Sequence, residues 1–441
     1  MSSQDFIITP ITFLVLMLLA YIMREVTSDD ETKKYFYPAL LLKMIGAIGV
    51  GIIYQFYYGG GDTFTYFTHG ASHIFDAFQD DFSKGIKLLT ANGEWDPETY
   101  KYASRIWMYR DPNSYFIVRI VAVFGLITLN TYSSIALFFA FFSFWGLWLM
   151  YQRFYKIYPE LKRHFAIAIF FIPTVFFWGS GILKDTITLG AVGFLVYAFM
   201  QIFFERKNIL INSLIVLLSV YVIYSVKLYI LLSLAPVLIF WFFIYRIERI
   251  PSMVVKILIA PVLLAIGLFL AYFVALKAGE DNKKYALDKI AETAQVTAYD
   301  IRYYTGKDAG SGYALGELDG TFGSMIRLAP QAVNVALFRP YIWEVSNPLM
   351  LLSAIEALFL FFLFARLLWR NKFSDVMASV RTPIILFCLL FSIIFAFGVG
   401  ISTYNFGTLS RYRIVMVPFF VMALFLLDFH ASARRNASDG E

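Results

Sequence analysis

The residues that are best suited to chemistry lie where apolar stretches end. The segment 59–62 (GGGD) directly follows the second apolar stretch. Its three glycines permit positive φ angles and a close approach of the backbone to a ligand. Asp62 then has two main interpretations, besides that of a solvated loop residue. It is either the N-cap of the next helix, or a carboxylate that takes a proton from an attacking hydroxyl or holds a metal ion. The sequence leaves both open.

A second group lies in segment 179–185 (GSGILKD), between two apolar segments. A charged pair is costly at membrane depth unless it is partnered or hydrated. One interpretation is a turn whose lysine reaches the lipid headgroups. In the other, Lys184 holds a phosphate, and Asp185 orients it or caps the next helix. The break in the apolar pattern favours the second interpretation.

Three arginines are further candidates. Arg339 lies beside a proline, just before a predicted span, where it is either an interfacial anchor or a ligand of an anionic headgroup. Arg411 and Arg413 precede the last predicted span, and polar residues flank them. Guanidinium groups bind phosphate oxygens in pairs of hydrogen bonds, so this spacing suits a pyrophosphate. All three arginines are therefore predicted to bind substrate.

Metal ligands are sparse. His69 and His73 are four residues apart, as a zinc pair on a helix would be, but no neighbouring Glu or third ligand accompanies them. No metal site is therefore predicted, and no cofactor is expected with certainty, although a divalent cation at Asp62 is left open. The one cysteine, Cys388, excludes a disulfide framework or thiolate metal site. Lys227 interrupts the apolar stretch 209–245, which indicates a hairpin turn.

Apolar helices must position these residues. The chain has 441 residues, of which 59% are hydrophobic, and its mean hydropathy of +0.67 lies outside the range of soluble proteins. A bilayer core of about 30 Å needs about 20 apolar residues per helix. The predicted spans are 6–23, 38–57, 115–130, 133–152, 164–178, 186–204, 209–226, 228–245, 253–276, 348–366, 382–402 and 412–429. We expect an all-α bundle of about 11–13 spans, forming one membrane domain over residues 1–441.

Charge predicts the orientation. The formal net charge is +6, but the basic residues flank the membrane spans, so a nucleic-acid partner is not expected. The basic clusters after residue 153 face the cytoplasm if the positive-inside rule holds. Segments 179–185, 277–347 and 403–411 then face outward.

The two elaborated loops are 59–113 and 277–347. Loop 59–113 is acidic, which favours the outer side. That placement requires one of the segments 115–130 and 133–152 to be re-entrant or interfacial. Apolar residues from Phe64 to Phe78 recur at helical spacing, which predicts an amphipathic helix lying along the interface. A second short helix is predicted over 100–108.

These features resemble a known class. An Asp after an early span, with juxtamembrane helices in an outer loop, resembles the GT-C membrane glycosyltransferases. Segments 176–185 (FFWGSGILKD) and 410–413 (SRYR), the latter followed by Pro418, are similar to stretches of bacterial polysaccharide enzymes, including exopolysaccharide and O-antigen polymerases. In the GT-C class the Asp usually follows the first span and belongs to an acidic pair, whereas Asp62 follows the second apolar segment.

The resemblance implies sugar transfer from a polyprenyl-phosphate-linked donor to a hydroxyl of a glycan or lipid acceptor, in a bacterial inner membrane with the active face outward. It implies Asp62 as the catalytic base and the late arginines as phosphate ligands. The hypothesis requires these charges to meet in one hydrated cleft. A transporter or flippase for a lipid-linked glycan or another anion is the alternative, and a non-catalytic scaffold is a third.

Overall fold

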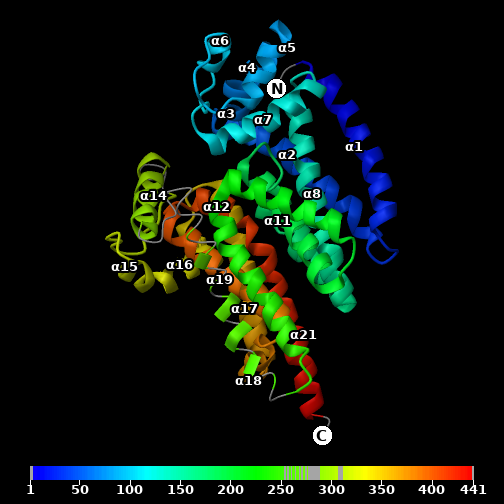
Figure 1. The fold of residues 1–441 in the computed structure, drawn as a ribbon. Coiled ribbons are helices and arrows are strands. Elements are labelled where there is room, and N and C mark those ends of the chain that lie inside the picture. The colour runs from blue at the N-terminus through cyan, green and yellow to red at the C-terminus, as the bar shows by residue number, and fades with distance from the viewer. Residues whose placement is uncertain are drawn as a thin grey trace. The chain divides into compact units, whose positions relative to one another are not determined.

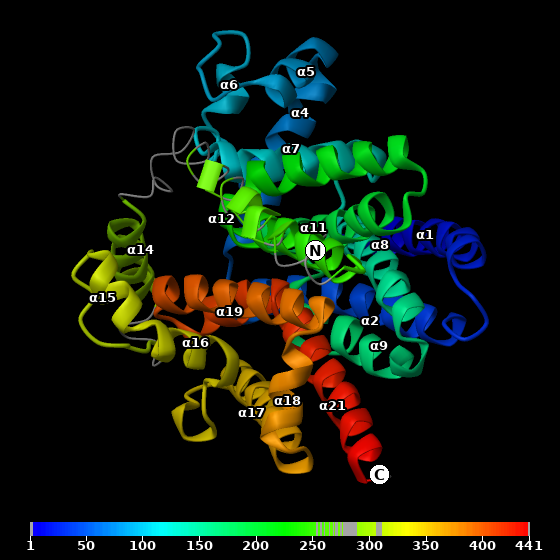
Figure 2. The same ribbon diagram turned by 60° about the horizontal axis from the view of Figure 1, so that its bottom comes forward.

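The computed structural model describes residues 3–252, 289–305 and 311–439, together with individual positions between 255 and 276 (Figures 1 and 2). The predicted all-α class is confirmed: over these residues the chain is helical, and its sole β-type pairing is the isolated bridge between Gly312 and Asn405. The predicted span 253–276 lies mostly outside the described residues.

Eight helices in the described part of the chain are long and apolar enough to cross a bilayer. The chain is therefore a multi-pass membrane protein. The eight segments are Asp5–Thr27 (α1), Lys33–Tyr57 (α2 with a π-helical end), Tyr132–Ile157 (α8), Lys184–Glu205 (α11 with a π-helical end), Ile209–Glu248 (α12), Pro348–Arg370 (α17), Pro383–Thr403 (α19) and Val417–Asn436 (within α21).

Four predicted spans have a different form, which lowers the count of long helices in the described residues. The segment predicted at 115–130 is α7 (Pro112–Ile127), with 16 residues. The segment 164–178 divides into α9 (Lys162–Phe170) and α10 (Pro173–Trp178), because a proline inside a helix has no N–H to donate. The two spans predicted around Lys227 belong to α12, where that residue alone leaves the helical conformation, with φ −146° and ψ 78°.

The chain forms two compact units. Unit 1 comprises residues 1–162 and 175–227, and unit 2 comprises residues 163–174 and 228–441. Each unit is described by itself below.

In unit 1, glycines allow α8 and α11 to approach closely. A Cβ on Gly146 would lie 2.0 Å from the carbonyl oxygen of Gly190, and a Cβ on Gly193 would lie 2.5 Å from that of Gly146. Small residues at such contacts let backbones pack directly, which stabilises helix pairs in lipid through van der Waals contact. The tight pair fixes the start of α11, where Lys184 and Asp185 lie.

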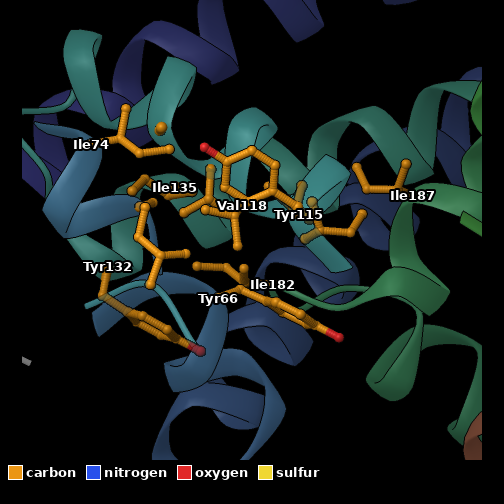
Figure 3. Close-up of a cluster of buried hydrophobic side chains, with 14 of the residues drawn as sticks. Tyr66, Ile74, Tyr115, Val118, Tyr132, Ile135, Ile182 and Ile187 are labelled. Atoms are coloured by element: carbon orange, nitrogen blue, oxygen red, sulfur yellow. The ribbon is translucent and has the colours of Figure 1, made fainter. Parts of the chain in front are cut away.

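Loop 59–113 contains helices, as predicted. They are α3 (Asp62–Tyr66), α4 (Ser72–Asp80), α5 (Phe82–Thr90) and α6 (Tyr100–Ala103), with a π-helical turn at Phe67–Ala71. Ile74 of α4 packs into a core with Tyr115 and Val118 of α7 and Tyr132 of α8 (Figure 3). The apolar side of this loop is thus anchored on unit 1.

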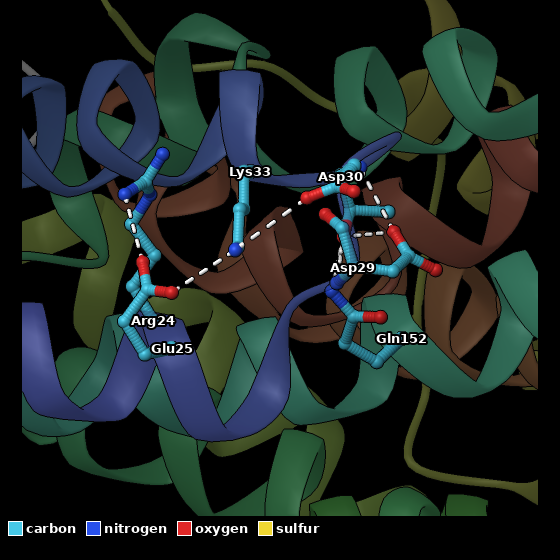
Figure 4. A network of polar contacts seen from close by, with 7 residues as sticks. Arg24, Glu25, Asp29, Asp30, Lys33 and Gln152 are labelled. Atoms are coloured by element: carbon cyan, nitrogen blue, oxygen red, sulfur yellow. Dashed lines mark hydrogen bonds and ion pairs between the residues drawn. The ribbon is translucent and has the colours of Figure 1, made fainter.

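The turn between α1 and α2 is held by a polar network (Figure 4). Lys33 binds Glu25 at 3.0 Å, and Thr32 donates its backbone N–H to Asp29. Gln152 of α8 donates to the Thr32 hydroxyl at 3.0 Å. These bonds fix α2 against α8.

In unit 2, the described part of loop 277–347 is also helical, with α14 (Ile290–Thr305), α15 (Phe322–Arg327) and α16 (Ala329–Phe338). A Cβ on Gly400 of α19 would lie 2.1 Å from the carbonyl oxygen of Ala332, so α16 packs directly on α19. After α17, the chain continues through α18 (Phe373–Val380), α19, α20 (Phe406–Tyr412) and α21 (Val417–Asp439).

Candidate functional site

Asp62 begins α3 after a turn that only glycine accommodates easily. The φ angles of Gly59, Gly60 and Gly61 are 67°, 143° and 119°, in the region that residues with a Cβ rarely adopt. A Cβ on Gly61 would also lie 2.8 Å from the Tyr54 ring. The N-cap interpretation of Asp62 is wrong, because Gly61 occupies the N-cap position. The carboxylate of Asp62 is instead exposed in the first turn of α3, where the helix dipole favours negative charge.

Lys184 is the centre of a charge cluster within unit 1. Its Nζ lies 3.7 Å from Oδ2 of Asp111. The charges of Asp62, Asp185 and Lys227 also act on it electrostatically. The Lys184 side chain is 20% exposed and that of Asp111 is 46% exposed, so both are accessible to a ligand. We call these five residues the Lys184 cluster.

The inner part of the Lys184 cluster is a buried ion pair. Lys227 Nζ lies 2.5 Å from Oδ1 of Asp185, and the two side chains are 8% and 1% exposed. A buried charge is costly unless it is paired, so each residue needs the other. The hairpin interpretation of Lys227 is replaced by this pairing: the residue forms a one-residue break in α12, and its ammonium group bonds to α11.

Asp111 joins the cluster through α7. It is the N-cap of that helix and accepts hydrogen bonds from the backbone N–H of Asn113, at 3.2 Å, and from the Ser114 hydroxyl. Asn113 in turn donates to the carbonyl oxygen of Ser225, at 3.0 Å, next to the break in α12. The sequence carried a signal for this cap, since an Asp followed by Pro112 is typical of a helix start.

Lys43 of α2 holds the broken segment that precedes Lys184. Its buried Nζ donates to the Ser143 hydroxyl at 2.9 Å and to the carbonyl oxygens of Val175 and Gly179 at 3.3 and 2.6 Å. An ammonium group has three donors, so all three are used. Sequence analysis missed Lys43, although a single lysine inside the apolar run 38–57 was the available signal.

Arg413 lies in unit 2 and is fully buried. Its Nη2 binds Glu356 at 3.0 Å, and both side chains are 0% exposed. Arg413 also donates to the carbonyl oxygen of Arg339, at 3.0 Å. Glu356 accepts two further hydrogen bonds of 2.7 Å from the backbone N–H and hydroxyl of Thr174. Arg413 thus has a protein carboxylate as its partner.

Arg339 also has an acidic partner. Its Nε lies 3.1 and 3.0 Å from the two carboxylate oxygens of Glu344. Burial alone would raise the pKa of Glu344, but the hydrogen bonds from Arg339 and the Tyr341 amide hold that pKa below its ordinary value. Hydrogen bonding to Glu344 raises the pKa of Arg339. Arg411, at the end of α20, is partly exposed.

The structure therefore brings together some predicted residues. Asp62, Lys184 and Asp185 belong to the Lys184 cluster in unit 1, whereas the three arginines belong to unit 2. A meeting of the arginines with Asp62 stays a prediction.

The histidine pair has no metal-site geometry. His69 leaves the helical conformation, with φ −95° and ψ 15°, so it does not share a regular helix face with His73. Its ring stacks on Trp107, with centroids 3.8 Å apart and an interplanar angle of 6°. Among the described residues, no group of three or more His, Cys, Asp or Glu side chains could hold a metal ion. A divalent cation at Asp62 stays a prediction.

The fold and cluster define the class of protein as an all-α, multi-pass membrane protein with an ionic site at its helix ends. No protein-family model, curated protein or solved structure matches the chain.

Proposed function

We propose that the protein is a membrane glycosyltransferase. It transfers a sugar from a polyprenyl-phosphate or -diphosphate donor to a hydroxyl of a glycan or lipid acceptor during cell-envelope assembly, and a polysaccharide polymerase is included in this proposal. The membrane is a bacterial inner membrane, and the site faces outward. The proposal rests on the exposed carboxylate of Asp62, directly after the glycine turn, and on the partly exposed ammonium of Lys184 in the same unit, 3.7 Å from Asp111.

The two groups suit the two halves of the reaction. Asp62 takes the proton of the acceptor hydroxyl while that oxygen forms a bond to the anomeric carbon of the donor. The bond between the anomeric carbon and the phosphate oxygen breaks, and its electron pair leaves with the polyprenyl phosphate. Lys184 stabilises the charge that develops on this leaving group. Asp62 then returns its proton to water.

The other members of the cluster position these groups. The 3.7 Å separation between Lys184 and Asp111 exceeds the ordinary range of a hydrogen bond. Lys184 can therefore exchange Asp111 for a phosphate without breaking a short bond. The Asp185–Lys227 pair and the bonds of Lys43 fix the start of α11. Arg411 stays a predicted phosphate ligand.

The test is sugar transfer in proteoliposomes supplied with lipid-linked donor and acceptor. Loss of a general base typically lowers a rate by about 10²- to 10⁴-fold, so we expect Asp62→Asn to lower transfer by this factor. Asp76→Asn is the matched control, because Asp76 is another exposed acid of loop 59–113. Transfer by Asp62→Asn at the wild-type rate would remove Asp62 from the mechanism.

A transporter or flippase for a lipid-linked glycan or other anion is the second candidate. It is favoured by the buried Asp185–Lys227 pair, which lies where α12 is broken, because intramembrane ion pairs often mark transport pathways. Movement of the lipid-linked glycan between leaflets, with its sugar–phosphate bond intact, would favour this function. Consumption of the donor without any gradient would favour the transferase.

A further inference from the structure

Tyr132 is the first residue of α8, and its side chain is buried in the core of unit 1 (Figure 3). Its hydroxyl shares a hydrogen bond of 2.7 Å with the hydroxyl of Thr63, which is fully buried. Thr63 directly follows Asp62 in α3. The hydrogen bond therefore joins α8 to the residue next to the exposed carboxylate.

The ring of Tyr132 makes further contacts around Asp62. It stacks on Phe64 of α3, with centroids 4.8 Å apart and an interplanar angle of 17°. It also packs edge to face against Phe67 of the next turn, at 5.4 Å and 79°. A Cβ on Gly51 of α2 would lie 2.6 Å from the same ring, so only glycine leaves room for the ring there. Tyr132 thus contacts both α2 and α3, the helices on either side of the glycine turn.

The short helix α3 depends on such contacts for its orientation. Its five residues are too few for a helix that is stable by itself. A Cβ on Gly59 or Gly60 would meet no atom within 4 Å, so this part of the turn before Asp62 borders open space. Close packing begins again at Thr63. The contacts of Thr63 and Phe64 with Tyr132 therefore orient the helix that begins with Asp62.

Tyr132 also belongs to the helix pair that carries Lys184. The helix α8 packs directly on α11 through their glycines, and Lys184 is the first residue of α11. The buried side chains of Ile182 and Ile187, on either side of Lys184 in the sequence, belong to the same core cluster as Tyr132. The contacts of Tyr132 therefore tie the helix of Asp62 to the packed helices that hold Lys184.

We propose that Tyr132 is a positioning residue for the transfer reaction, and that it holds α3 so that the carboxylate of Asp62 meets the acceptor hydroxyl. This inference rests on the proposed function of Asp62 as the general base. Tyr132 acts through Thr63 and Phe64 and touches no reacting atom. A displacement of about 1 Å can lower a rate by about 100-fold. The role of Tyr132 is therefore expressed in kcat rather than in donor binding.

The first test is sugar transfer in proteoliposomes by Tyr132→Phe and Thr63→Val, which remove the shared hydrogen bond and keep the size of each side chain. We expect each variant to lower kcat by about 10- to 100-fold and to leave KM for the lipid-linked donor unchanged. The double variant should be no slower than the slower single variant, because both changes remove one interaction. Tyr115→Phe is the matched control and should keep the wild-type kcat. Tyr115 is buried in the same core, but its hydroxyl donates to the carbonyl oxygen of Leu88, at 2.6 Å, and not to α3.

The second test measures the position of α3 without any reaction. Spin labels are attached to Asp62→Cys and Ile157→Cys in a Cys388→Ala background, because Ile157 is exposed at the far end of α8. The distribution of distances between the two labels is read by double electron–electron resonance. We expect this distribution to broaden in Tyr132→Phe and to stay narrow in Tyr115→Phe.

A distance distribution of unchanged width in Tyr132→Phe, or the same broadening in Tyr115→Phe, would overturn the proposal. A wild-type kcat in Tyr132→Phe, or an equal loss of kcat in Tyr115→Phe, would overturn it as well. If the unsubstituted protein transfers no sugar, the proposed enzyme fails, whereas the distance measurement still shows whether Tyr132 orients the helix of Asp62. The two failures are therefore distinguishable.

Discussion

Each unit contains an ion pair among apolar helices, but the two pairs differ in exposure. In unit 1, Lys184 and Asp111 are 20% and 46% exposed and 3.7 Å apart. In unit 2, Arg413 and Glu356 are 0% exposed and 3.0 Å apart. A long, partly exposed ion pair leaves its charges accessible to a ligand, whereas a short buried pair stabilises the fold. Because of this difference in exposure, we assign the Lys184–Asp111 pair to the candidate site and the Arg413–Glu356 pair to a structural role.

The largest effect on stability is expected from removing one partner of the buried Arg413–Glu356 pair of unit 2. Arg413→Met leaves Glu356 without its cation, and removing one partner of a buried pair typically costs about 3–5 kcal/mol. We expect a marked fall in the thermal unfolding midpoint of the detergent-solubilised protein. The Glu356→Leu/Arg413→Met double variant should recover part of the loss, because no buried charge then lacks a partner.

A role of Arg413 in activity without a role in stability would contradict the structural assignment of the Arg413–Glu356 pair. An Arg413→Met protein with unchanged stability and abolished sugar transfer would mean that Arg413 is a ligand of the substrate.

Lys184→Met should change activity and not stability. Lys184 is partly exposed, and hydrogen bonds to charged groups typically contribute about 1.5–3 kcal/mol, so we expect transfer to fall by about 10- to 100-fold. The unfolding midpoint should stay close to that of the wild type. Lys87→Met is a matched control, because Lys87 is an exposed, ion-paired lysine of loop 59–113. A large loss of stability in Lys184→Met would make the Lys184 cluster structural.

Lys43→Met tests the support behind the cluster. The change leaves the carbonyl oxygens of Val175 and Gly179 without their donor, and an unsatisfied buried polar group costs about 1–3 kcal/mol. We expect a moderate fall in the unfolding midpoint and weaker donor binding, read as a raised KM. Lys33→Met, at the surface end of the same helix, should leave KM unchanged. If KM were also unchanged in Lys43→Met, the broken segment would not position Lys184.

The smallest effect on stability is expected when a change in pH protonates Glu344 in the Arg339–Glu344 pair. The pKa of Glu344 is below its ordinary value of about 4.5 in the folded protein, so the pair stabilises the fold above that pH. This contribution is lost as the pH falls through the lowered pKa. Because both side chains are partly exposed, we expect less than about 1 kcal/mol.

The measurement is thermal unfolding of wild type and Glu344→Gln at pH 7 and pH 4. The wild type should be the more stable protein at pH 7, and the difference should narrow at pH 4. A difference that widens at pH 4 would contradict the direction of the shift.

The sequence predicted the elements and part of the site for a clear physical reason. Long apolar runs must be helical in a bilayer, because no water is available there to satisfy the backbone. Polar residues at the ends of those runs stand out, and Asp62 and Lys184 were found in this way. The form of α9, α10 and α12 depends on Pro173 and on the pairing of Lys227, which hydropathy does not report.

The partners could not be predicted, because they are distant along the chain. Glu356 is 57 residues from Arg413, and Gly179 is 136 residues from Lys43. Lys43 and Glu356 were nevertheless visible as single charges inside apolar runs, which need a partner. Sequence analysis therefore identifies charges that require an explanation, and only packing shows which of them are already satisfied.

The most direct test of the account is the accessibility of the two reactive positions to a membrane-impermeant thiol reagent. Asp62→Cys and Lys184→Cys are made separately in a Cys388→Ala background, and the unsubstituted protein, with its buried Cys388, is the comparison. We predict that the cysteines at 62 and 184 react from the same side of the membrane, that lipid-linked donor slows both reactions, and that Cys388 does not react. Labelling of positions 62 and 184 from opposite sides would contradict a shared site.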